Sequence, residues 1–545
     1  MRLKRIELYD DFRSLKSGFS IDFIKEPVSD KSAIEPYCIV GRNGSGKSNI
    51  LELLAAIFYQ VEISRLDFLP RDMVIKYNED DEEYEDEEEL EVFLSNTTEP
   101  NAYKLEYFMT IDGEERLVTI DKKADEYREI YLDENSKEPL GKAELQNTDR
   151  NILPEYIIGY SSGQNEILSL PFYKMRLIQL DEYIEYLYAN LEFHDHESKL
   201  IYLDDNFSQA IFLTNFIFAD KDDHIVNSVF KKTIGVEYIE SFRIVINHGV
   251  NTSINGDRKK IIEKVSHTVE ALKNCATMYF EDDKELILDF FIDKKGEMRS
   301  AFIKNFGTKI KLFEAFQTFI NLNYYHIDVA TKHKLYNSKS LFAKGYLPQT
   351  SWNRMFFTFK DFMLKKTGIE DTVHSRSLSD GEYQFLHSIG LALIYRDTQS
   401  LFLLDEPETH FNPSWRAEYM RVLEKCFSGI KTKAEFLITS HSPFIVSDTH
   451  KEKVLIFEKE KGKVNFRKAP FNTFGASSNK ITIEIFDKEE TIGKVAQDKV
   501  DEFDKKIKNS KDLEKLMGDV EKELGDSMEK MLLLQKIIKQ KEGKK

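Results

Sequence analysis

The residues that decide the fold are Gly41-Arg-Asn-Gly-Ser-Gly-Lys-Ser48. This stretch matches the pattern G-x-x-x-x-G-K-[ST] at every fixed position. It follows the apolar segment Tyr37–Val40, which is typical of a buried strand. The apolar residues after it recur at helical spacing and predict a helix: Ile50, Leu51, Leu53, Leu54 and Ile57. A glycine-rich loop between a buried strand and a helix is the context that this pattern requires.

The residue types in this loop explain how it would bind phosphate. The glycines let the backbone turn tightly, so that its N–H groups can point at phosphate oxygens. The helix that follows adds the positive end of its dipole. Lys47 would neutralise the β- and γ-phosphates, and Ser48 would hold Mg²⁺ through its hydroxyl. The predicted nucleotide-binding residues of this loop are Gly41, Arg42, Asn43, Gly44, Ser45, Gly46, Lys47, Ser48 and Asn49.

A second stretch, Leu401-Phe-Leu-Leu-Asp-Glu406, supplies two acidic groups. Its four apolar residues predict a strand buried on both faces, which would deliver Asp405 to the carboxyl end of the strand. Open α/β sheets bind their ligands at that end. We therefore expect Asp405 to bind Mg²⁺, directly or through water, and Glu406 to polarise the attacking water as a general base.

A third stretch, Ser377-Leu-Ser-Asp-Gly-Glu382, shortly precedes that strand. Ser379 and Glu382 have the spacing of a capping box, and the apolar residues after them continue a helix. The pattern alone therefore predicts a well-capped helix. Together with the glycine-rich loop, however, Leu378–Glu382 resembles the signature motif of ABC-type ATPases, with Asp380 where a glycine is usual.

The resemblance to ABC-type ATPases implies ATP and Mg²⁺ as ligands and assigns roles to further residues. In that family the signature of one subunit completes the ATP site of another, in a head-to-tail dimer or higher oligomer. The signature residues that would face the nucleotide are Ser379, Asp380, Gly381 and Glu382. Gln164 resembles the Q-loop glutamine that senses Mg²⁺ and the γ-phosphate. His441 resembles the switch histidine, which would act with Glu406 in catalysis.

The separation of the motifs indicates one branch of this family. Lys47 and Ser379 are 332 residues apart (379 − 47). That split, with Asn43 in the loop and Asp405-Glu-Pro-Glu408 after the strand, resembles the chromosome-maintenance, recombination and overcoming-lysogenisation-defect ATPases. No heptad repeat is sustained between the motifs, so we expect a compact lid instead of a long coiled coil. The segment after His441 has no strand end with paired carboxylates, so we expect no nuclease activity from this chain alone.

Three short strings narrow the resemblance: Phe12-Arg-Ser-Leu15, Tyr160-Ser-Ser-Gly163 and Leu524-Gly-Asp-Ser527. As a set they resemble the PtuA-like ATPases of Septu systems and of some retrons. This resemblance implies antiphage defence, in which the ATPase regulates a separate PtuB-like HNH nuclease. In retrons a reverse transcriptase and its RNA-linked DNA would be further partners. Arg13 could reach the nucleotide or a phosphate backbone, or it could be an exposed surface arginine.

Composition is consistent with a folded, cytoplasmic protein. The 545 residues are 41% hydrophobic and 32% charged, which predicts a sizeable core and a solvated surface. Three cysteines form no disulfide framework, and no apolar run reaches the ~20 residues needed to span a bilayer. The net charge is −18, and residues 79–91 hold eleven acidic residues of thirteen. We therefore expect neither membrane binding nor general coating of nucleic acid, although a local basic groove stays possible.

These patterns predict an α/β fold class: a split ABC-type ATPase head, in which the P-loop sheet is joined by an antiparallel β subdomain. An inserted, mainly helical lid and a helical C-terminal extension complete the chain. The expected domains are residues 1–172 and 373–486 for the two lobes of the head, 173–372 for the lid and 487–545 for the extension. In the extension, Asp526-Ser-Met-Glu529 predicts a capped helix with Met528, Met531, Leu532 and Ile538 on one face.

Two other functions stay open at this point. One is a recombination or repair ATPase that acts directly on DNA. ATP hydrolysis by the purified chain that DNA stimulates would support this function. The other is a scaffold that bound nucleotide stabilises and that has little turnover.

Overall fold

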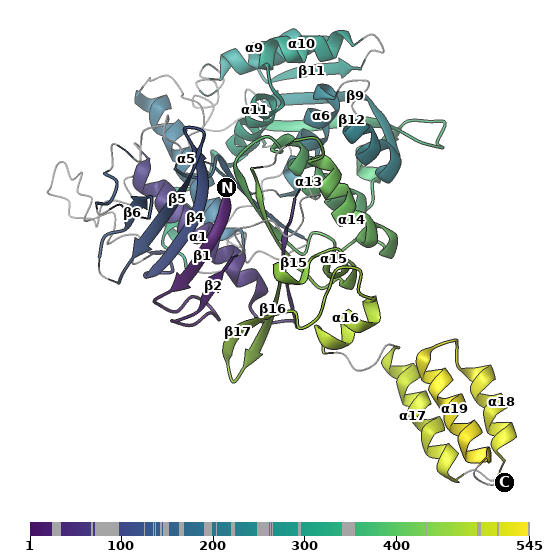
Figure 1. The fold of residues 1–545 in the computed structure, drawn as a ribbon. Coiled ribbons are helices and arrows are strands. Elements are labelled where there is room, and N and C mark those ends of the chain that lie inside the picture. Colours follow the sequence, from purple (N-terminus) through teal and green to yellow (C-terminus); the bar gives the residue numbers. More distant parts are fainter. Residues whose placement is uncertain are drawn as a thin grey trace. The chain divides into compact units, whose positions relative to one another are not determined.

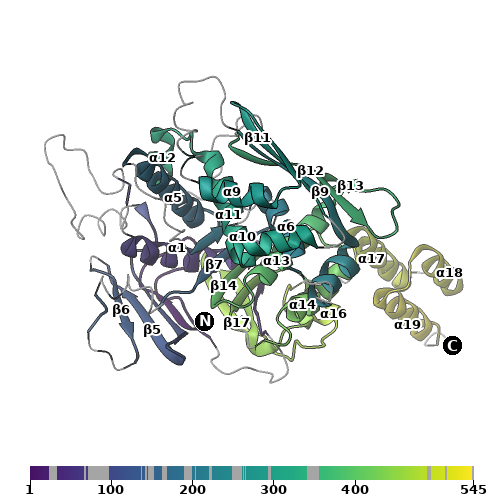
Figure 2. The same cartoon turned by 90° about the horizontal axis from the view of Figure 1, so that it is seen from above.

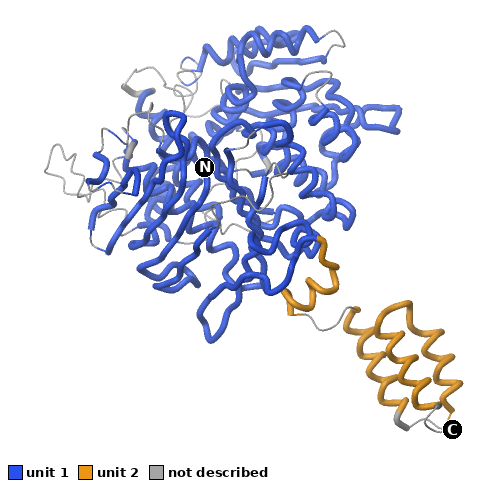
Figure 3. Tube along the Cα trace, viewed as in Figure 1, with its two compact units in different colours: residues 1–474 blue, residues 475–545 orange. Residues whose placement is uncertain are grey.

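The chain forms two compact units, Met1–Phe474 and Gly475–Lys545 (Figure 3). The acidic segment 79–91 and Gln164 lie outside the part of the chain that the structure describes. The structure is a computed structural model that describes residues 1–23, 34–66, 69–70, 97–124, 126–134, 136, 138–141, 144, 152–162, 168–189, 199–202, 204–219, 224–247, 261, 263, 265–292, 296–339, 355–430, 433–487, 492–509 and 512–542.

The centre of the first unit is a seven-stranded sheet. Every strand in it except β17 runs parallel to its neighbours, and β17 pairs antiparallel with β16. The buried strands predicted around residues 37–40, 156–160 and 401–404 all belong to this sheet, as expected from their apolar runs. In spatial order the strands are β17 (Lys463–Lys468), β16 (Val454–Glu460), β3 (Tyr37–Gly41), β15 (Glu435–Ser440), β14 (Ser400–Asp405), β7 (Tyr156–Ser161) and β8 (Leu200–Tyr202).

Helices cover both faces of this sheet (Figure 2). A Cβ added to Gly159 of β7 would lie 2.6 Å from the ring of Phe172 on α5. The next residue, Tyr160, meets the ring of His387 on α13 at a centroid distance of 6.0 Å. Because successive side chains of a strand point to opposite faces, α5 and α13 lie on opposite faces of the sheet. The helices nearest the sheet are α1 (Lys47–Arg65), α5 (Leu170–Ala189), α13 (Asp380–Ile394), α14 (Pro413–Cys426) and α15 (Pro443–Ser447).

An antiparallel sheet packs on the outer side of α1 (Figure 1). Phe58 of α1 meets Tyr107 of β4 with ring centroids 5.6 Å apart, and the Tyr103 hydroxyl donates to Gln60 Oε1 at 3.0 Å. The hairpin predicted at Asp112-Gly113 joins β4 to β5, with φ of 54° and 82° at its two turn residues. The strand order is β2 (Ser20–Asp22), β1 (Arg2–Leu8), β4 (Tyr103–Ile111), β5 (Glu114–Lys122) and β6 (Glu129–Leu132).

The inserted segment is mainly helical, as predicted, and it also contains a third sheet of five strands. Its irregular pattern did not predict most of these strands, because β9 ends at Asn247 and its partner β12 begins at Phe357, far along the chain. The strands in order are β10 (Met278–Glu281), β11 (Glu285–Phe291), β9 (Val236–Asn247), β12 (Phe357–Lys366) and β13 (Val373–His374). The helices include α6 (Ser208–Phe218), α7 (His224–Val226), η2 (Asn227–Ile234), α9 (Ser266–Cys275), α10 (Glu297–Phe306), α11 (Lys309–Asn321) and α12 (Val329–Tyr336).

Phenylalanine rings join the inserted sheet to its helices. Phe242 of β9 stacks on Phe290 of β11 with centroids 4.4 Å apart, and Phe290 meets Phe302 of α10 at 5.8 Å. Phe212 of α6, which is buried, contacts Phe362 of β12 at 6.0 Å. These aromatic side chains form the core of the inserted segment, which is the use that such residues most often have.

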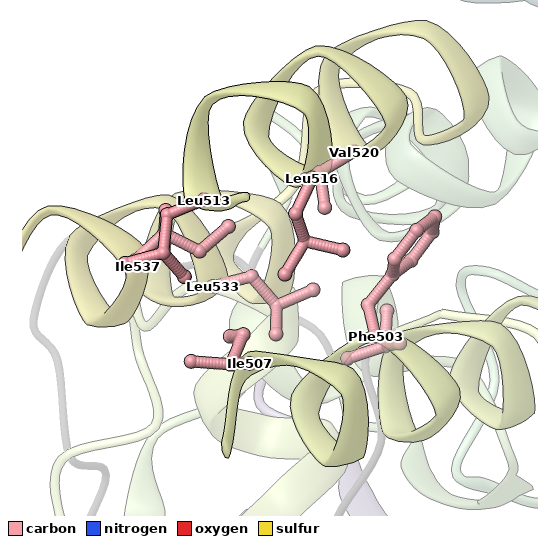
Figure 4. Packing of buried hydrophobic residues seen from close by; sticks show 8 residues of the cluster. Phe503, Ile507, Leu513, Leu516, Val520, Leu533 and Ile537 are labelled. Carbon is pink, nitrogen blue, oxygen red and sulfur yellow. The ribbon is translucent and has the colours of Figure 1, made fainter. Parts of the chain in front are cut away.

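The second unit is helical: α16 (Ser478–Glu484), α17 (Lys494–Asn509), α18 (Leu513–Glu523) and α19 (Met528–Glu542). The last three helices share a small core (Figure 4), which consists of Val500, Phe503, Ile507, Leu513, Leu516, Val520, Leu533 and Ile537. The hydroxyl of Ser527 caps α19 by accepting from Lys530 N at 3.1 Å. The cap therefore lies one residue later than the predicted pair of Asp526 and Glu529. None of the described helices is long and apolar enough to cross a membrane.

The tight packing of Gly41 against strand β16 gives a test of the central sheet. Gly41 has φ +149°, and a Cβ there would lie 2.2 Å from the carbonyl oxygen of Phe457. Gly235 also has positive φ, but a Cβ there meets no atom within 4 Å. We expect Gly235→Ala to lower the free energy of unfolding by about 1 kcal/mol, from backbone strain alone. Gly41→Ala should lower it by about 2 kcal/mol more, because the backbone must also move to relieve the clash with Phe457. Thermal unfolding of the two variants measures the difference, and equal losses would contradict this packing.

Candidate functional site

The parallel central sheet brings the predicted site residues to one edge. Strands β3, β15, β14 and β7 are successive neighbours, so their carboxyl ends lie side by side. In this register Asp405 pairs with Thr439 on one side and with Ser161 on the other. Ser440 pairs with Val40, next to the glycine-rich loop. The loop, the acidic pair and the segment that contains His441 therefore meet at the same place.

The glycine-rich loop has the backbone that its sequence predicts. Gly44 and Gly46 have φ of +74° and +91°, which only glycine adopts without strain. Asn49 Nδ2 donates to Ser14 Oγ at 2.6 Å, which ties the loop to the turn at residues 12–15. Lys47 is 5% exposed, and its ammonium donates to the carbonyl oxygens of Gly41 and Arg42, at 3.3 and 3.2 Å. Burial lowers the pKa of Lys47, against the opposing effect of the nearby carboxylates.

The Asp405 carboxylate is buried and is surrounded by hydroxyl groups from three other elements. Ser48 Oγ donates to Asp405 Oδ1 at 2.8 Å, and Thr439 Oγ1 donates to the same oxygen at 2.5 Å. Ser161 Oγ donates to Oδ2 at 3.4 Å. Burial raises the pKa of Asp405, and the bonds from Thr439 and Ser48 lower it again in part. Ser48 and Asp405, the two residues of the described part predicted to hold the metal, are thus in direct contact.

Glu406 and His441 form a second pair beside this carboxylate. His441 Nε2 lies 3.2 Å from Glu406 Oε1, and both side chains are about a third exposed. The hydrogen bond to His441 lowers the pKa of Glu406. Glu406 has φ +48°, a conformation that costs a non-glycine residue about 1 kcal/mol or more. Its N–H donates to both the carbonyl and the hydroxyl oxygen of Thr439, which holds the strained residue in place.

The residues fit Mg²⁺ and a phosphate chain by their chemistry. Hydroxyl and carboxylate oxygens are the ligands that Mg²⁺ prefers, and Ser48 and Asp405 supply one of each. A cation here would also offset the cost of burying the carboxylate. The Ser45 hydroxyl in the loop is buried and has no hydrogen-bond partner among the residues that the structure describes, so it leaves a polar atom for a ligand to satisfy.

The signature residues lie at the N-terminus of α13, and the capping box predicted there is confirmed. Ser379 N donates to Glu382 Oε2 at 2.7 Å, and Glu382 N donates to Ser379 Oγ at 3.3 Å. Glu382 also pairs with Lys366 of β12. A Cβ on Gly381 would lie 2.8 Å from the carbonyl oxygen of His410, so this position has room only for glycine. Asp380 occupies the first turn of α13.

Arg13 is not the exposed surface arginine that was one of the two alternatives from the sequence. Its side chain is 18% exposed and pairs with Glu52 of α1 at 2.9 Å and with Glu99 at 2.6 Å. It also donates to the carbonyl oxygen of Lys339. Burial raises the pKa of Glu52 to about 7, and the charge of Arg13 opposes this shift. In this structure Arg13 is a largely covered link between the start of the chain, the P-loop helix and the inserted segment.

Three residues at the site were not identified from the sequence. Thr439 and Ser161 bond to Asp405, and Glu408 accepts from Ser440. Ser161 and Thr439 lie at the ends of apolar strands, and Glu408 follows one. This position is the signal in the sequence that could have identified them. Recognising them requires the strand order of the sheet, because β15 and β7 bring Thr439 and Ser161 to Asp405 from distant parts of the chain, and β15 brings Ser440 to Glu408.

Comparison with known proteins gives two family matches. The model of a family described as "AAA domain" matches residues 9–206. Another, described as "AAA domain, putative AbiEii toxin, Type IV TA system", matches residues 278–447. The chain carries AAA-type P-loop ATPase domains. The two matched segments contain the glycine-rich loop and the Asp405–His441 region respectively.

Solved structures similar to the chain include heads of the SMC ATPases. The SMC head domain from Thermotoga maritima is 12% identical with a TM-score of 0.32, covering 86% of this chain and 100% of that chain. A crystal structure of the SmcHead bound to the C-winged helix domain of ScpA is 12% identical with a TM-score of 0.33, covering 86% and 97%. No curated protein sequence matches the chain.

Glu408 gives a test of the electrostatics of this edge. The residue is 3% exposed, and burial raises its pKa from 4.5 to about 7. Because the folded-state pKa is the higher one, the protonated form stabilises the fold below pH 4.5, and this stabilisation is lost as the pH rises through 7. The side chain of the Glu408→Gln variant stays neutral at every pH. Relative to that of the parent, its free energy of unfolding should therefore rise by up to roughly 3 kcal/mol as the pH increases from 5 to 8.

Thermal unfolding at the two pH values measures this gain. Glu418→Gln, on the exposed face of α14, is the matched control and should change little at either pH. A Glu408→Gln protein whose stability follows that of the parent at both pH values would show that this carboxyl group is not held in a desolvated site.

Proposed function

We propose that this protein binds ATP with Mg²⁺ at the carboxyl edge of the central sheet and hydrolyses it to ADP and phosphate. The observation that carries the proposal is the contact between Ser48 and Asp405 at 2.8 Å, with Glu406 and His441 adjoining. A phosphate-binding loop, a carboxylate suited to Mg²⁺ and a second, ionised carboxylate are the parts that hydrolysis of a phosphoanhydride requires. The matches to AAA domains support the same activity.

Each residue has a distinct part in this proposal. The N–H groups of the loop and the Lys47 ammonium bind the β- and γ-phosphates, which requires the ammonium to leave the carbonyl oxygens of Gly41 and Arg42. Ser48 and Asp405 hold Mg²⁺, whose charge would offset that of the phosphates. Glu406 accepts a proton from the attacking water, since its lowered pKa keeps it ionised at neutral pH. His441 orients Glu406 through the bond of 3.2 Å.

We further propose that the signature at α13 acts on the nucleotide of another copy. A helix N-terminus favours anions, and Ser379 caps that terminus. ATP bound between two copies would hold them together, and hydrolysis would release them, which provides two states with different contacts. Gln164, which follows β7 in the sequence, is proposed to sense Mg²⁺ and γ-phosphate at the same edge.

The cellular role that we propose is control of a separate HNH nuclease in antiphage defence. Three strings support it by their resemblance to PtuA-like ATPases: Phe12–Leu15, Tyr160–Gly163 and Leu524–Ser527. The family matched at residues 278–447 is described as "AAA domain, putative AbiEii toxin, Type IV TA system". In a retron setting, a reverse transcriptase and its RNA-linked DNA would join the complex.

Substitutions at Lys47 and Glu406 separate binding from hydrolysis. Lys47→Ala should weaken binding of a fluorescent ATP analogue by about 100-fold or more, because the phosphates lose their fixed cation. Glu406→Gln should keep binding but lower the rate of phosphate release by about 10²–10⁴-fold, the usual contribution of a general base. It should also accumulate as a dimer with ATP, measured by light scattering.

Lys16→Ala, at an exposed lysine that pairs with Asp11, is the matched control for Lys47. If Lys47→Ala and Glu406→Gln both hydrolyse ATP at the parental rate, the site is elsewhere. If Glu406→Gln stops hydrolysis yet retains every cellular activity, the protein is a nucleotide-stabilised scaffold.

Control of a nuclease is tested by reconstitution of the purified chain with a PtuB-like HNH nuclease. We expect the nuclease to bind the purified chain and its DNA cleavage to differ at least 10-fold between the ATP-loaded Glu406→Gln complex and the nucleotide-free Lys47→Ala complex. Equal cleavage in both complexes, or no binding, would contradict this role. If DNA stimulates ATP hydrolysis by the chain without the nuclease, this result would instead favour a repair ATPase.

A further inference from the structure

Glu408 is a buried acidic residue on the same segment as the general base that we propose. It follows Glu406 by two positions, and it is 3% exposed. Its Oε1 accepts a hydrogen bond from the hydroxyl of Ser440, the last residue of β15. Its Oε2 is also buried and has no partner among the residues that the structure describes. A buried carboxyl group with an unpartnered oxygen lowers the stability of a fold, so stability does not explain its presence here.

The Ser440 hydroxyl continues this contact across the turn that contains His441. Ser440 Oγ donates to Glu408 and accepts from the backbone N–H of Ser442 at 2.9 Å. A hydroxyl has one proton to donate, so the bond to Glu408 directs its lone pairs to that N–H. Ser440 and Ser442 are 0% and 3% exposed, whereas the His441 side chain between them is 33% exposed. The turn is therefore fixed on both sides of the histidine.

Two contacts flank the one between Glu406 and His441. On one side, the N–H of Glu406 donates to the carbonyl and hydroxyl oxygens of Thr439. On the other side, Glu408 accepts from Ser440. The segment after β14 and the end of β15 are thus joined at three successive points. The distance of 3.2 Å between His441 Nε2 and Glu406 Oε1 belongs to the middle one.

The carboxylate of Glu406 has supports that do not involve Glu408. Thr409 Oγ1 donates to Glu406 Oε2 at 3.4 Å, and Thr409 N donates to the carbonyl oxygen of Glu406 at 3.2 Å. Ser162 Oγ, at the end of β7, donates to Thr409 Oγ1 at 2.9 Å. Loss of the Glu408 carboxyl group should therefore displace His441 more than it displaces Glu406.

We propose that Glu408 is a positioning residue that holds His441 against Glu406 during hydrolysis. It acts through the Ser440 hydroxyl, since its burial keeps it from the substrate. This inference rests on the proposed ATPase function and adds a residue to it. A misplacement of about 1 Å would break a hydrogen bond of 3.2 Å, and a shift of that size can lower a rate by ~10²-fold. A group that is unfavourable for folding is then explained by catalysis, because such exceptions concentrate at functional sites.

The main experiment measures steady-state ATP hydrolysis by full-length variants with Mg²⁺. Glu408→Met removes the carboxyl group and keeps the volume of the side chain, so the interior stays filled. It should lower kcat by roughly 10- to 100-fold, because the imidazole is no longer held. KM for ATP should stay within about 2-fold, since the phosphate-binding loop is untouched. Glu408→Gln keeps an oxygen that can accept from Ser440, so its kcat should stay within about 3-fold of the parent.

Two further variants control for effects on the fold. Glu435→Met is the matched control, because Glu435 is a buried carboxyl group at the other end of β15. It should leave kcat unchanged, whatever it does to the thermal unfolding temperature. Ser440→Ala removes the hydroxyl between Glu408 and the turn, and it should lose as much kcat as Glu408→Met. It also tests the proposal if the Glu408→Met protein does not fold, which thermal unfolding shows.

A double-mutant cycle with His441 separates positioning from a general effect on the fold. If Glu408 acts through the imidazole, Glu408→Met should lower kcat no further once His441→Ala has removed that ring. An equal fold-loss in both backgrounds would overturn the proposal. So would a Glu408→Met protein that hydrolyses ATP at the parental rate, or a Glu408→Gln protein that is as slow as Glu408→Met.

The same series distinguishes this inference from the proposed ATPase function. Parental rates in both Lys47→Ala and Glu406→Gln would place the ATPase site elsewhere and overturn both. A parental rate in His441→Ala would overturn the roles of His441 and Glu408 and leave the ATPase site in place. If all three variants lose hydrolysis and Glu408→Met does not, only the role of Glu408 is wrong.

Discussion

The carboxylate of Asp405 is 1% exposed, and the arrangement of the ATPase site depends on how it is held there. A buried carboxylate is costly unless hydrogen bonds or a cation compensate it. Here the hydroxyls of Ser48, Thr439 and Ser161 supply the bonds, and they come from α1, β15 and β7. Because three elements converge on one side chain, the strand order and the position of the P-loop helix are tied to the same point.

This constraint also explains how a chain with a long insertion keeps one site. The insertion starts and ends within the first unit, since β9 and β12 pair with each other although they lie far apart in the sequence. Arg13 provides another link, because it joins Glu52 of the P-loop helix to Glu99 and to the carbonyl oxygen of Lys339. A movement of the inserted segment would therefore act on α1, whose first residues are Lys47 and Ser48.

The sequence predicted the features that local pattern encodes. The strand–loop–helix around Gly41–Ser48, the hairpin at Asp112-Gly113 and the capping box at Ser379 each depend on neighbours a few residues away. Thr439 and Ser161 could not be assigned in this way, because their contact with Asp405 exists only once β15, β14 and β7 are adjacent. The partners of Arg13 could not be assigned for the same reason, since Glu52 and Glu99 are distant from it in sequence.

The C-terminal helices show a further limit of pattern reading. In α19 the apolar residues surround the helix, so periodicity could not decide which of them face the core. The structure assigns the core to Leu533 and Ile537, and it leaves Met531 and Leu532 more than half exposed.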